Sequence, residues 1–402
     1  MCPSSLTASC AEKPSPEVAG DLLAALAAVP DPRPGGARRH PVAYVLGVLV
    51  AAFASAGFES FTAAAQWAAA ADPTLLLALG AAPDPLTGQV RAPSEPTIRR
   101  IATRVDPEAV EAVVAAWTAG RLGTAPSGAG RVAVAVDGKT VRGARVGEQT
   151  APHLLAAATH ERPVVLAQRA VPGKTNEITM VPALLDDLRA AGHDLAAMTF
   201  TLDALHTQHA TADLLEGAGA GYVMTVKANQ PTLLAAVIDA LGTGTPASTG
   251  QRSRGHARTA ERLLQVVPAT GIVFPGAAQV FRIIRHTGGL DGQRTRKEVV
   301  HAITNLAAAH TGPAQLATLV RGHWSIENPI HWVRDVTYRE DASTVRTGNA
   351  PAVLAAVRNV VTTVLRLAGA ANIAAARRAA ILDPRTAIRL LTHTPNQDKR
   401  SL

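Results

Sequence analysis

The feature that most constrains this chain is a change of pattern at the Gly-, Ser- and Pro-containing stretch Gly123–Gly130. Before it, apolar residues recur at the three- and four-residue spacing of amphipathic helices. After it, short runs of apolar and β-branched residues have the length of strands. Because clusters of Gly and Pro between such segments mark loops, we expect a helical region and a β-containing region joined by a linker at residues 123–130.

The region before the linker is expected to form an all-helical N-terminal domain at residues 17–122, behind a disordered tail at residues 1–16. The predicted helices are Pro16–Val29, Pro41–Ala56, Ser60–Ala71, Pro73–Leu79, Ser94–Val105 and Asp106–Arg121. One of them lies in the uncharged stretch Pro41–Phe58. Alanine and glycine dilute this stretch below the apolarity of the about 20 residues that a membrane span needs, so we expect a buried helix and no membrane partner.

Beyond the linker, strand-like and helix-like segments alternate. Strands are predicted at Val132–Val136, Leu154–Thr159, Val164–Val171, Met198–Leu202 and Tyr222–Val226, and helices at Asn176–Ala191, Thr207–Gly217 and Thr232–Leu241. Strands separated by a helix favour a parallel pair in an α/β core, whereas the short turn at residues 160–163 favours a hairpin within it. This first part of the core is expected at residues 131–230.

A second group of strand-like runs indicates a β-rich insertion at residues 231–318. Its predicted strands are Thr259–Val267, Gln279–His286 and Glu298–Thr304. A helical pattern returns at Gly312–Arg339 and Ala350–Gly369, and we assign residues 319–370 to helices of the core. Residues 371–402 are expected to form a C-terminal tail.

The chain is basic, with 39 Lys and Arg against 31 Asp and Glu, a net charge of +8 and a pI of about 10.1. This balance favours a polyanionic partner such as nucleic acid. The basic loop Asp31–His40, which includes Arg38 and Arg39, fits a contact with the DNA backbone as well as a solvated turn. The only two cysteines, Cys2 and Cys10, exclude a disulfide scaffold and a Cys-rich zinc site, and they indicate a cytoplasmic protein.

Two Gly-Lys-Thr triplets, which begin at Gly138 and Gly173, suggest a nucleotide-binding loop. Such a loop needs a glycine five residues before the Gly-Lys pair, and those positions hold Ala133 and Gln168. ATP binding is therefore not expected. The chain also has neither a Gly-x-Ser-x-Gly elbow nor a His-Glu-x-x-His motif.

Asp137 and Asp203 each follow a strand-like apolar run. If those strands are neighbours, both carboxylates lie at one edge of the sheet, where α/β folds bind ligands. Two carboxylates this close repel each other, and a hard divalent cation between them relieves the repulsion. An Asp at a strand end is also a common turn former, so the pair indicates a site more strongly than either residue alone.

The segment Arg321–Asp335 holds two of the four tryptophans and several polar residues at helical spacing. Glu327, His331 and Arg334 recur at i, i+4 and i+7, so they would share one face of a helix. A salt-bridged surface helix also fits this spacing, but charged residues beside two tryptophans favour a functional site.

Two further residues qualify this interpretation. Pro329 is compatible with the helix if Ser325 caps it and the proline falls in its first turns. His323 and His331 could instead bind a metal, although zinc is the weaker interpretation without cysteines.

Several segments resemble insertion-sequence DDE transposases of the ISAs-type, H-repeat-associated branch. These segments are Val136–Arg142, Lys174–Ile178, Leu202–Gln208, Val226–Pro231, His323–Asn328 and His331–Ser343. Near the N-terminus, Asp31–Arg33, Arg39–Pro41 and Thr97–Arg100 resemble the domain that accompanies this family. The resemblance extends from about residue 20 to residue 370.

The resemblance implies a ribonuclease-H-like mixed sheet whose catalytic acids and metal ligands are Asp137, Asp203 and Glu327. In better-known relatives a Tyr, an Arg and a Lys surround the catalytic Glu, and the corresponding places here hold Val320, His323 and Arg334. The residues expected to contact DNA are Lys139, Arg142, Lys227, Arg321, His323, His331, Arg334, Arg38 and Arg39.

The implied cofactor is a pair of Mg²⁺ ions, which Mn²⁺ can replace. Two such ions ~3.5–4 Å apart clamp the attacking and leaving oxygens of an in-line phosphodiester displacement. The implied reaction is cleavage of the element ends followed by strand transfer. The implied partners are the terminal inverted repeats, target DNA and a second copy of the chain in the synaptic complex.

Two other functions stay open at this point. One is a nuclease on the same core that cuts without joining, and the other is a catalytically silent DNA-binding descendant of a transposase. Three intact carboxylates argue against the silent protein. Asp335, Glu340 or Asp341 could also supply the third carboxylate in place of Glu327.

Overall fold

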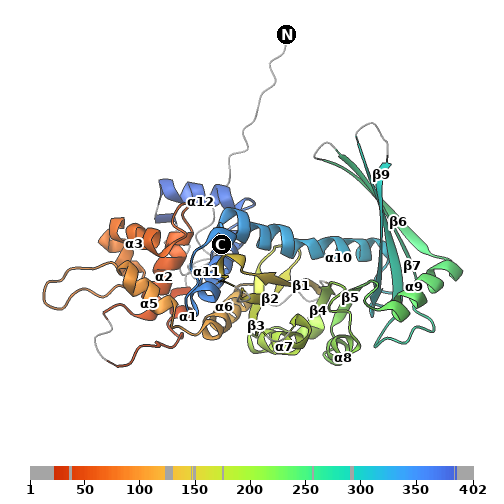
Figure 1. The fold of residues 1–402 in the computed structure, drawn as a ribbon, viewed down its shortest axis with the longest axis horizontal. Coiled ribbons are helices and arrows are strands. Elements are labelled where there is room, and N and C mark those ends of the chain that lie inside the picture. The colour runs from red at the N-terminus through yellow and green to blue at the C-terminus, as the bar shows by residue number, and fades with distance from the viewer. Residues whose placement is uncertain are drawn as a thin grey trace, which may run out of the picture. The chain divides into compact units, whose positions relative to one another are not determined.

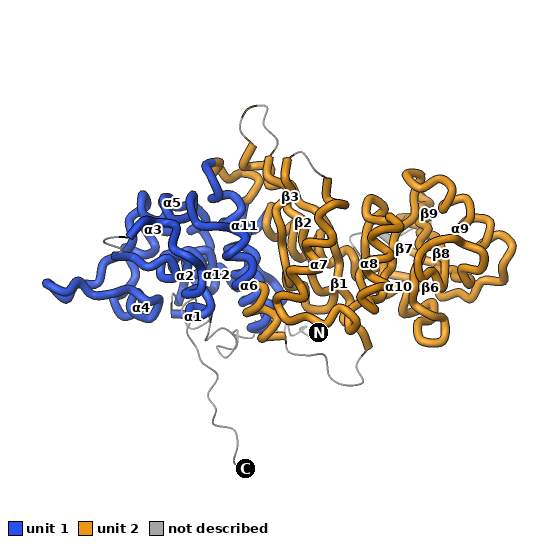
Figure 2. The backbone as a smooth tube through the Cα atoms, turned by 90° about the horizontal axis from the view of Figure 1, so that it is seen from below, with its two compact units in different colours: residues 1–114, 336–339, 347–402 blue, residues 115–335, 340–346 orange. Residues whose placement is uncertain are grey.

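The fold was analysed in a computed structural model, which describes residues 22–35, 39–122, 130–145, 147, 151–173, 176–255, 258–289, 294–383 and 385–386. The expected tail at residues 1–16 and nearly all of the expected linker lie outside the described residues. The chain divides into two compact units (Figure 2). The first comprises residues 1–114, 336–339 and 347–402, and the second comprises residues 115–335 and 340–346.

The described elements of the first unit are helices. They are α1 (Leu22–Leu26), α2 (Val42–Phe53), α3 (Phe61–Ala70), α4 (Pro73–Ala78), α5 (Glu95–Ala102), the first part of α6 (Pro107–Leu122), α11 (Ala350–Leu367) and α12 (Ile373–Leu382). The uncharged stretch forms the short helix α2, which is almost entirely buried, as the sequence predicts. Among the described helices, α11 alone has the length and mean hydropathy, 1.3, of a membrane span, but 83% of it is buried, as in the core helix of a globular unit.

The C-terminal helix α12 corrects the expectation of a tail from residue 371. Asn372 caps it by accepting a hydrogen bond from the N–H of Ala375. Its Arg377 is only 1% exposed, and its guanidinium lies 4.2 Å from the ring centroid of Tyr338. The guanidinium donates to the carbonyls of Phe53, Ser55 and Thr337 and pairs with Glu59. A buried arginine therefore anchors this alanine-rich helix, and composition alone does not reveal such an anchor.

Among its described residues, the second unit contains one mixed sheet of nine strands in the order β3-β2-β1-β4-β5-β9-β8-β7-β6 (Figure 1). The strands are β1 (Val132–Thr140), β2 (His153–Thr159), β3 (Val165–Val171), β4 (Met198–Leu202), β5 (Gly221–Val226), β6 (Ala247–Gly255), β7 (Arg258–Pro268), β8 (Gln279–Gly288) and β9 (Arg294–Thr304). The pairs β1–β4 and β4–β5 are parallel, and every other pair is antiparallel. The predicted parallel pair and the predicted β2–β3 hairpin are both confirmed.

Strand β6 is a strand that the sequence does not predict. Its Gly-, Ser- and Thr-rich composition favours a loop, yet it pairs with β7 along its whole length. Pairing with β7 therefore outweighs the weak intrinsic preference of these residues for a strand. Among the described residues, the strand group beyond β5 has four members, where the sequence indicates three.

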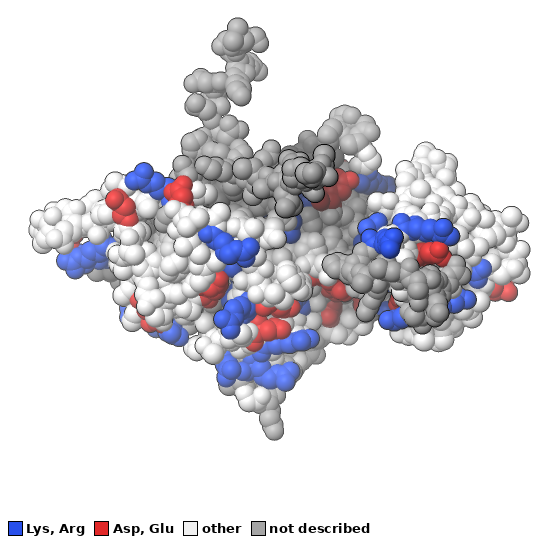
Figure 3. Space-filling model, turned by 90° about the horizontal axis from the view of Figure 1, so that it is seen from above, with Lys and Arg blue, Asp and Glu red and all other residues white. Residues whose placement is uncertain are grey.

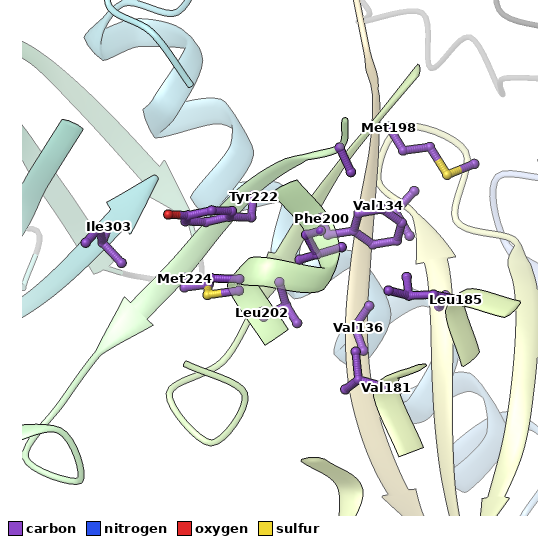
Figure 4. Packing of buried hydrophobic residues seen from close by; sticks show 14 of the residues in the cluster. Val134, Val136, Val181, Leu185, Met198, Phe200, Leu202, Tyr222, Met224 and Ile303 are labelled. Atoms are coloured by element: carbon purple, nitrogen blue, oxygen red, sulfur yellow. The ribbon is translucent and has the colours of Figure 1, made fainter. Parts of the chain in front are cut away.

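The two faces of the sheet pack against different helices (Figure 1). On one face, Val134 and Val136 of β1 join a large apolar core with α7 (Val181–Ala190) and α8 (His209–Gly217) (Figure 4). On the other face, small alanines of β1 and β2 pack against Ile326 and Ile330, at the end of α10 (Pro313–Ile326) and just beyond it. Because side chains alternate along a strand, Ala135, and with it Asp137, lies on the α10 side.

Replacing Arg377 by Ala should lower the free energy of unfolding by about 3 kcal/mol, because Glu59 and three carbonyls lose their buried partner. Urea denaturation would measure the loss. The matched control is Arg378→Ala on the exposed side of the same helix, which should change stability by less than about 0.5 kcal/mol. Equal effects of the two substitutions would contradict the anchoring role.

Candidate active site

The two aspartates lie together because their strands are parallel neighbours. The pairing of β1 with β4 ends at Val136 and Leu202, and Asp137 and Asp203 follow directly. Asp203 is two residues beyond Thr201, whose hydroxyl bonds a histidine of α10, so both carboxylates lie on the α10 side. Asp137 is not at the end of β1 as expected, because β1 continues to Thr140 in its pairing with β2.

Asp203 also forms a turn. Its Oδ1 accepts hydrogen bonds from the N–H groups of Leu205 (2.9 Å) and His206 (3.3 Å). The turn-forming interpretation of this residue is therefore correct, and it does not exclude a site, since these bonds use one carboxylate oxygen only.

Glu327 lies where helix α10 changes its geometry. Beyond Ile326 the backbone continues as two π-helical segments, η5 (Glu327–His331) and η6 (Val333–Thr337), and the N–H of Trp332 donates to the carbonyl of Glu327, five residues back. Pro329 has no N–H to give to the carbonyl four residues before it, and a widened turn accommodates this loss. Such turns are frequent at functional sites.

Ser325 does not cap this helix, so the condition under which Pro329 would fall in the first turns of a helix is not met. The helix begins at Pro313, and the Ser325 hydroxyl donates to the carbonyl of Thr159 on β2 (3.3 Å). Together with Ile326 and Ile330, this bond holds the segment that carries Glu327 against β1 and β2.

Electrostatic coupling links the three acids. The pKa of Asp137 is raised to about 7, first by burial, then by the negative charge of Glu327 and to a smaller extent by the charges of Glu177 and Asp203. The structure thus brings Asp137, Asp203 and Glu327 into one region of negative potential and adds Glu177 to them.

The donor set fits a hard divalent cation that keeps part of its water shell. Within the described ranges, no three His, Cys, Asp or Glu side chains lie close enough together to enclose one metal ion. Mg²⁺ does not require such a cage, because it uses one or two carboxylates, water and substrate phosphate oxygens. Mutual repulsion among the carboxylates is the condition that a bound cation would relieve.

Glu177 is a site residue that the residue-by-residue analysis misses. Its carboxylate is bonded by His153 Nε2 (2.6 Å) and by His206 Nε2 (3.2 Å), and His153 Nδ1 contacts the hydroxyl of Thr140 (2.8 Å). Burial alone would raise the pKa of Glu177, but these hydrogen bonds hold it at about 2. The one signal in the sequence is its place in the segment Lys174–Ile178.

Gly138 allows Glu177 to approach the strand. A Cβ at position 138 would lie 2.3 Å from the carboxyl carbon of Glu177. The hydrogen-bonded chain Thr140–His153–Glu177–His206 therefore supports β1 from the side opposite to Asp137, and it reaches the turn that follows Asp203.

Two of the basic residues expected to contact DNA are instead buried in ion pairs. Arg334 is 1% exposed, and its guanidinium binds Glu340 and Gln168 at 2.7–3.1 Å. Lys139 is 7% exposed and pairs with Asp335. Neither is free to hold a phosphate, and the two acids are occupied as well, which disfavours Asp335 and Glu340 as the third carboxylate.

The two histidines expected to contact DNA also lie inside the unit. His331 Nδ1 is 3.4 Å from Asp137 Oδ2, and burial lowers the pKa of His331 to about 3, so this contact is made by a neutral imidazole. His323 Nδ1 bonds the hydroxyl of Thr201 (3.0 Å), which His160 also contacts (2.9 Å). Both histidines support the acids from within.

The other predicted contacts are exposed. Arg142, Lys227 and Arg321 are on the surface of the second unit. Arg39, in the first unit, is exposed and pairs with Asp84, whereas Arg38 lies outside the described residues. Trp324 and Trp332, on either side of Glu327, are 52% and 54% exposed.

Comparison with known proteins gives a consistent assignment. The family model described as "Transposase DDE domain" matches residues 128–362, and the one described as "DDE_Tnp_1-associated" matches residues 23–118. "Putative transposase YncI" of Escherichia coli O157:H7 is 28% identical over 299 residues, which cover 68% of this chain and 71% of that protein. "H repeat-associated putative transposase YhhI" of Escherichia coli K12 is 27% identical over 245 residues, which cover 58% of this chain and 63% of that protein.

Two further similarities are more limited. An uncharacterized protein of Xanthobacter autotrophicus is 34% identical over 208 residues, which cover 51% of this chain and 65% of that protein. A cryo-EM structure of a piggyBac transposase synaptic complex with hairpin DNA has a TM-score of 0.40 and 9% identity, with coverage of 96% of this chain and 81% of that one. At that TM-score the structural likeness carries no inference.

In metal-free protein, Asp137→Asn should stabilise the fold at pH 8. A carboxyl whose pKa in the folded protein, about 7, exceeds its ordinary value of 3.8 makes stability fall as pH rises between those values. We expect a gain on the order of 2 kcal/mol at pH 8 that disappears near pH 4. Urea unfolding in EDTA would measure it, with the exposed Asp186→Asn as the control. A gain that is independent of pH would contradict the raised pKa.

Gly138→Ala should lower the free energy of unfolding by about 1–3 kcal/mol, because the new methyl group displaces the Glu177 carboxylate. Gly242→Ala is the matched control, since a Cβ at that helical position meets no atom within 4 Å and should be neutral or stabilising. Thermal unfolding of both variants would separate the local clash from a general effect of alanine.

Proposed function

Because this chain belongs to the transposase DDE domain family, we propose that it is the transposase of an insertion sequence, which cleaves the element ends and joins them to target DNA. The family match supports an enzyme that acts on DNA. The observation that carries the finer proposal is the coupling of Asp137, Asp203 and Glu327 in one region of negative potential on the α10 side of the sheet.

The proposed catalytic core is ribonuclease-H-like. The strand order β3-β2-β1-β4-β5 supports this proposal. Strands β1, β2 and β3 are joined in successive antiparallel pairs, and β4 and β5 run parallel to β1. Helix α9 (Pro231–Thr243) and strands β6–β9 correspond to the insertion at residues 231–318. The helical N-terminal domain at residues 17–122 then corresponds to the family's associated domain, and its match at residues 23–118 supports this.

The proposed ligands of two Mg²⁺ ions, or of Mn²⁺ in their place, are Asp137, Asp203 and Glu327. Bound there, the ions would supply a Lewis acid for the scissile phosphate and a stronger oxygen nucleophile. Asp137 has a pKa of about 7 without metal, so it would release its proton when a cation binds. The neutral His331 at 3.4 Å orients this carboxylate.

The remaining residues of the site hold the acids and the substrate. Glu177 and its two histidines fix β1 and the turn after Asp203. The exposed Arg142, Lys227 and Arg321 are placed to contact phosphates. Trp324 and Trp332 offer exposed aromatic faces, on which unpaired bases can stack.

The proposed partners are the terminal inverted repeats, target DNA and a second copy of the chain, since two element ends must be held together. Such a protein would act in the cytoplasm, on the nucleoid. A nuclease that cuts without joining and a silent DNA-binding protein are less favoured, because the family match and the coupled acids support full transposase chemistry.

A plasmid that carries the gene's native flanking DNA should be cut at defined positions by the wild type in the presence of Mg²⁺. Asp137→Ala, Asp203→Asn and Glu327→Gln should each lose more than about 100-fold of this activity, since loss of even a supporting residue around a metal costs 10–100-fold. Asp186→Asn should cut normally. Joining of a free 3′-hydroxyl end to a second plasmid would separate a transposase from a nuclease.

Two outcomes would contradict the assignment. Full cleavage by Glu327→Gln together with loss of cleavage in Asp335→Asn would move the third acid to Asp335. DNA binding without cleavage by the wild type would favour the silent binding protein.

A further inference from the structure

Two arginines face each other on neighbouring strands of the sheet. Arg262 of β7 pairs directly with Arg285 of β8, and the side chains of such partners lie on the same face, about 5 Å apart at Cβ. On that face, Leu264, two residues after Arg262, belongs to an apolar cluster with Leu316 and Val320 of α10. The two guanidinium groups therefore lie on the α10 side, just beyond this cluster.

Helix α10 adds a third arginine. Arg321 follows Val320 and is exposed. Burial lowers the pKa of Arg262, and the positive charges of Arg285 and Arg321 lower it further. Three guanidinium groups from β7, β8 and α10 thus share one region of positive potential.

The acids and acceptors nearby do not balance these charges. Arg262 donates to the neutral hydroxyl of Ser253 (3.1 Å). Arg285 lies 3.7 Å from the carboxylate of Glu298, and both side chains are about two-fifths exposed. The Nε of Arg285 is buried and finds no hydrogen-bond partner in the described part of the chain. Like charges placed opposite each other destabilise a sheet, so the fold maintains this arrangement at a cost.

We propose that Arg262, Arg285 and Arg321 bind a backbone phosphate of the DNA substrate. The planar forks of arginine match phosphate oxygens, and a phosphate would supply the missing acceptor and the missing negative charge. Lys and Arg side chains gather over the part of the second unit that carries the long strands (Figure 3). The inference rests on the proposed function, because it assigns this site to the same DNA.

The site lies close to Glu327 along α10 and the segment that continues it. Arg321 and Glu327 are six residues apart on one continuous helical segment, which corresponds to about 9 Å along the axis. One DNA strand rises about 3.4 Å per nucleotide. A phosphate beside Arg321 and a bond cut beside Glu327 are therefore close enough to belong to one short stretch of DNA.

The test is the salt dependence of DNA affinity in EDTA, with a labelled duplex that carries the element end as the probe. Arg262→Gln and Arg285→Gln should each reduce the slope of log affinity against log salt by about 1 and weaken binding several-fold at low salt. Arg285→Lys should restore the slope. Arg252→Gln is the control, because Arg252 lies on the opposite face of the same sheet and pairs with Glu261; it should leave the slope unchanged.

The outcomes separate this inference from the proposed function. Unchanged slopes in both glutamine variants, with normal binding and cleavage by the wild type, would overturn the phosphate site alone. If inorganic phosphate stabilises the wild type against thermal unfolding while the variants keep unchanged DNA slopes, the three arginines bind a free anion. That result would also overturn the DNA phosphate site. A wild type that does not bind DNA would overturn both proposals. Thermal unfolding should show the glutamine variants at least as stable as the wild type, whereas a loss of stability would indicate a structural role.

Discussion

The repulsion that the partly buried Asp137 meets from its neighbouring carboxylates is the constraint on which the second unit is built. The negative charges of Glu327 and Asp203 disfavour ionisation of Asp137, so electrostatics does not hold the three acids together. Apolar packing supplies the opposing force: small alanines on β1 and β2 let Ile326 and Ile330 pack closely, and this contact carries Glu327 to the sheet. From the other side, Gly138 leaves room for Glu177, whose histidine partners fix β1 and the turn after Asp203.

The positive charge of a residue does not by itself say whether its side chain faces solvent or the interior. Arg334 and Lys139 lie in motif segments that suggest phosphate contacts, yet each neutralises an acid inside the unit. Their ion pairs connect the π-helical segment to Glu340 and to β1, so they hold the region beyond Glu327 in place. Arg142 and Lys227, by contrast, are exposed.

Much of the sheet could be predicted from the sequence, because its strands are short apolar runs that end at charged residues. The adjacency of β1 and β4, which brings Asp137 and Asp203 together, follows from the strand–helix–strand pattern. Strand β6 and the helix α12 could not be predicted, since the first depends on pairing with β7 and the second on the buried Arg377. Glu177 and Arg285 could not be predicted for the same reason, because their partners are distant in sequence.

The pairing of β5 with β9 has a mechanical consequence. The added strands do not form a separate module on a hinge; they continue the hydrogen-bonded sheet through the pairs Val223–Thr304 to Val226–His301. A load applied to β7 or β8 passes through β9 and β5 to β4, the strand that carries Asp203. The outer strands are thus a continuous extension of the sheet, so that a force applied to them is transmitted toward Asp203 rather than being lost in a flexible joint.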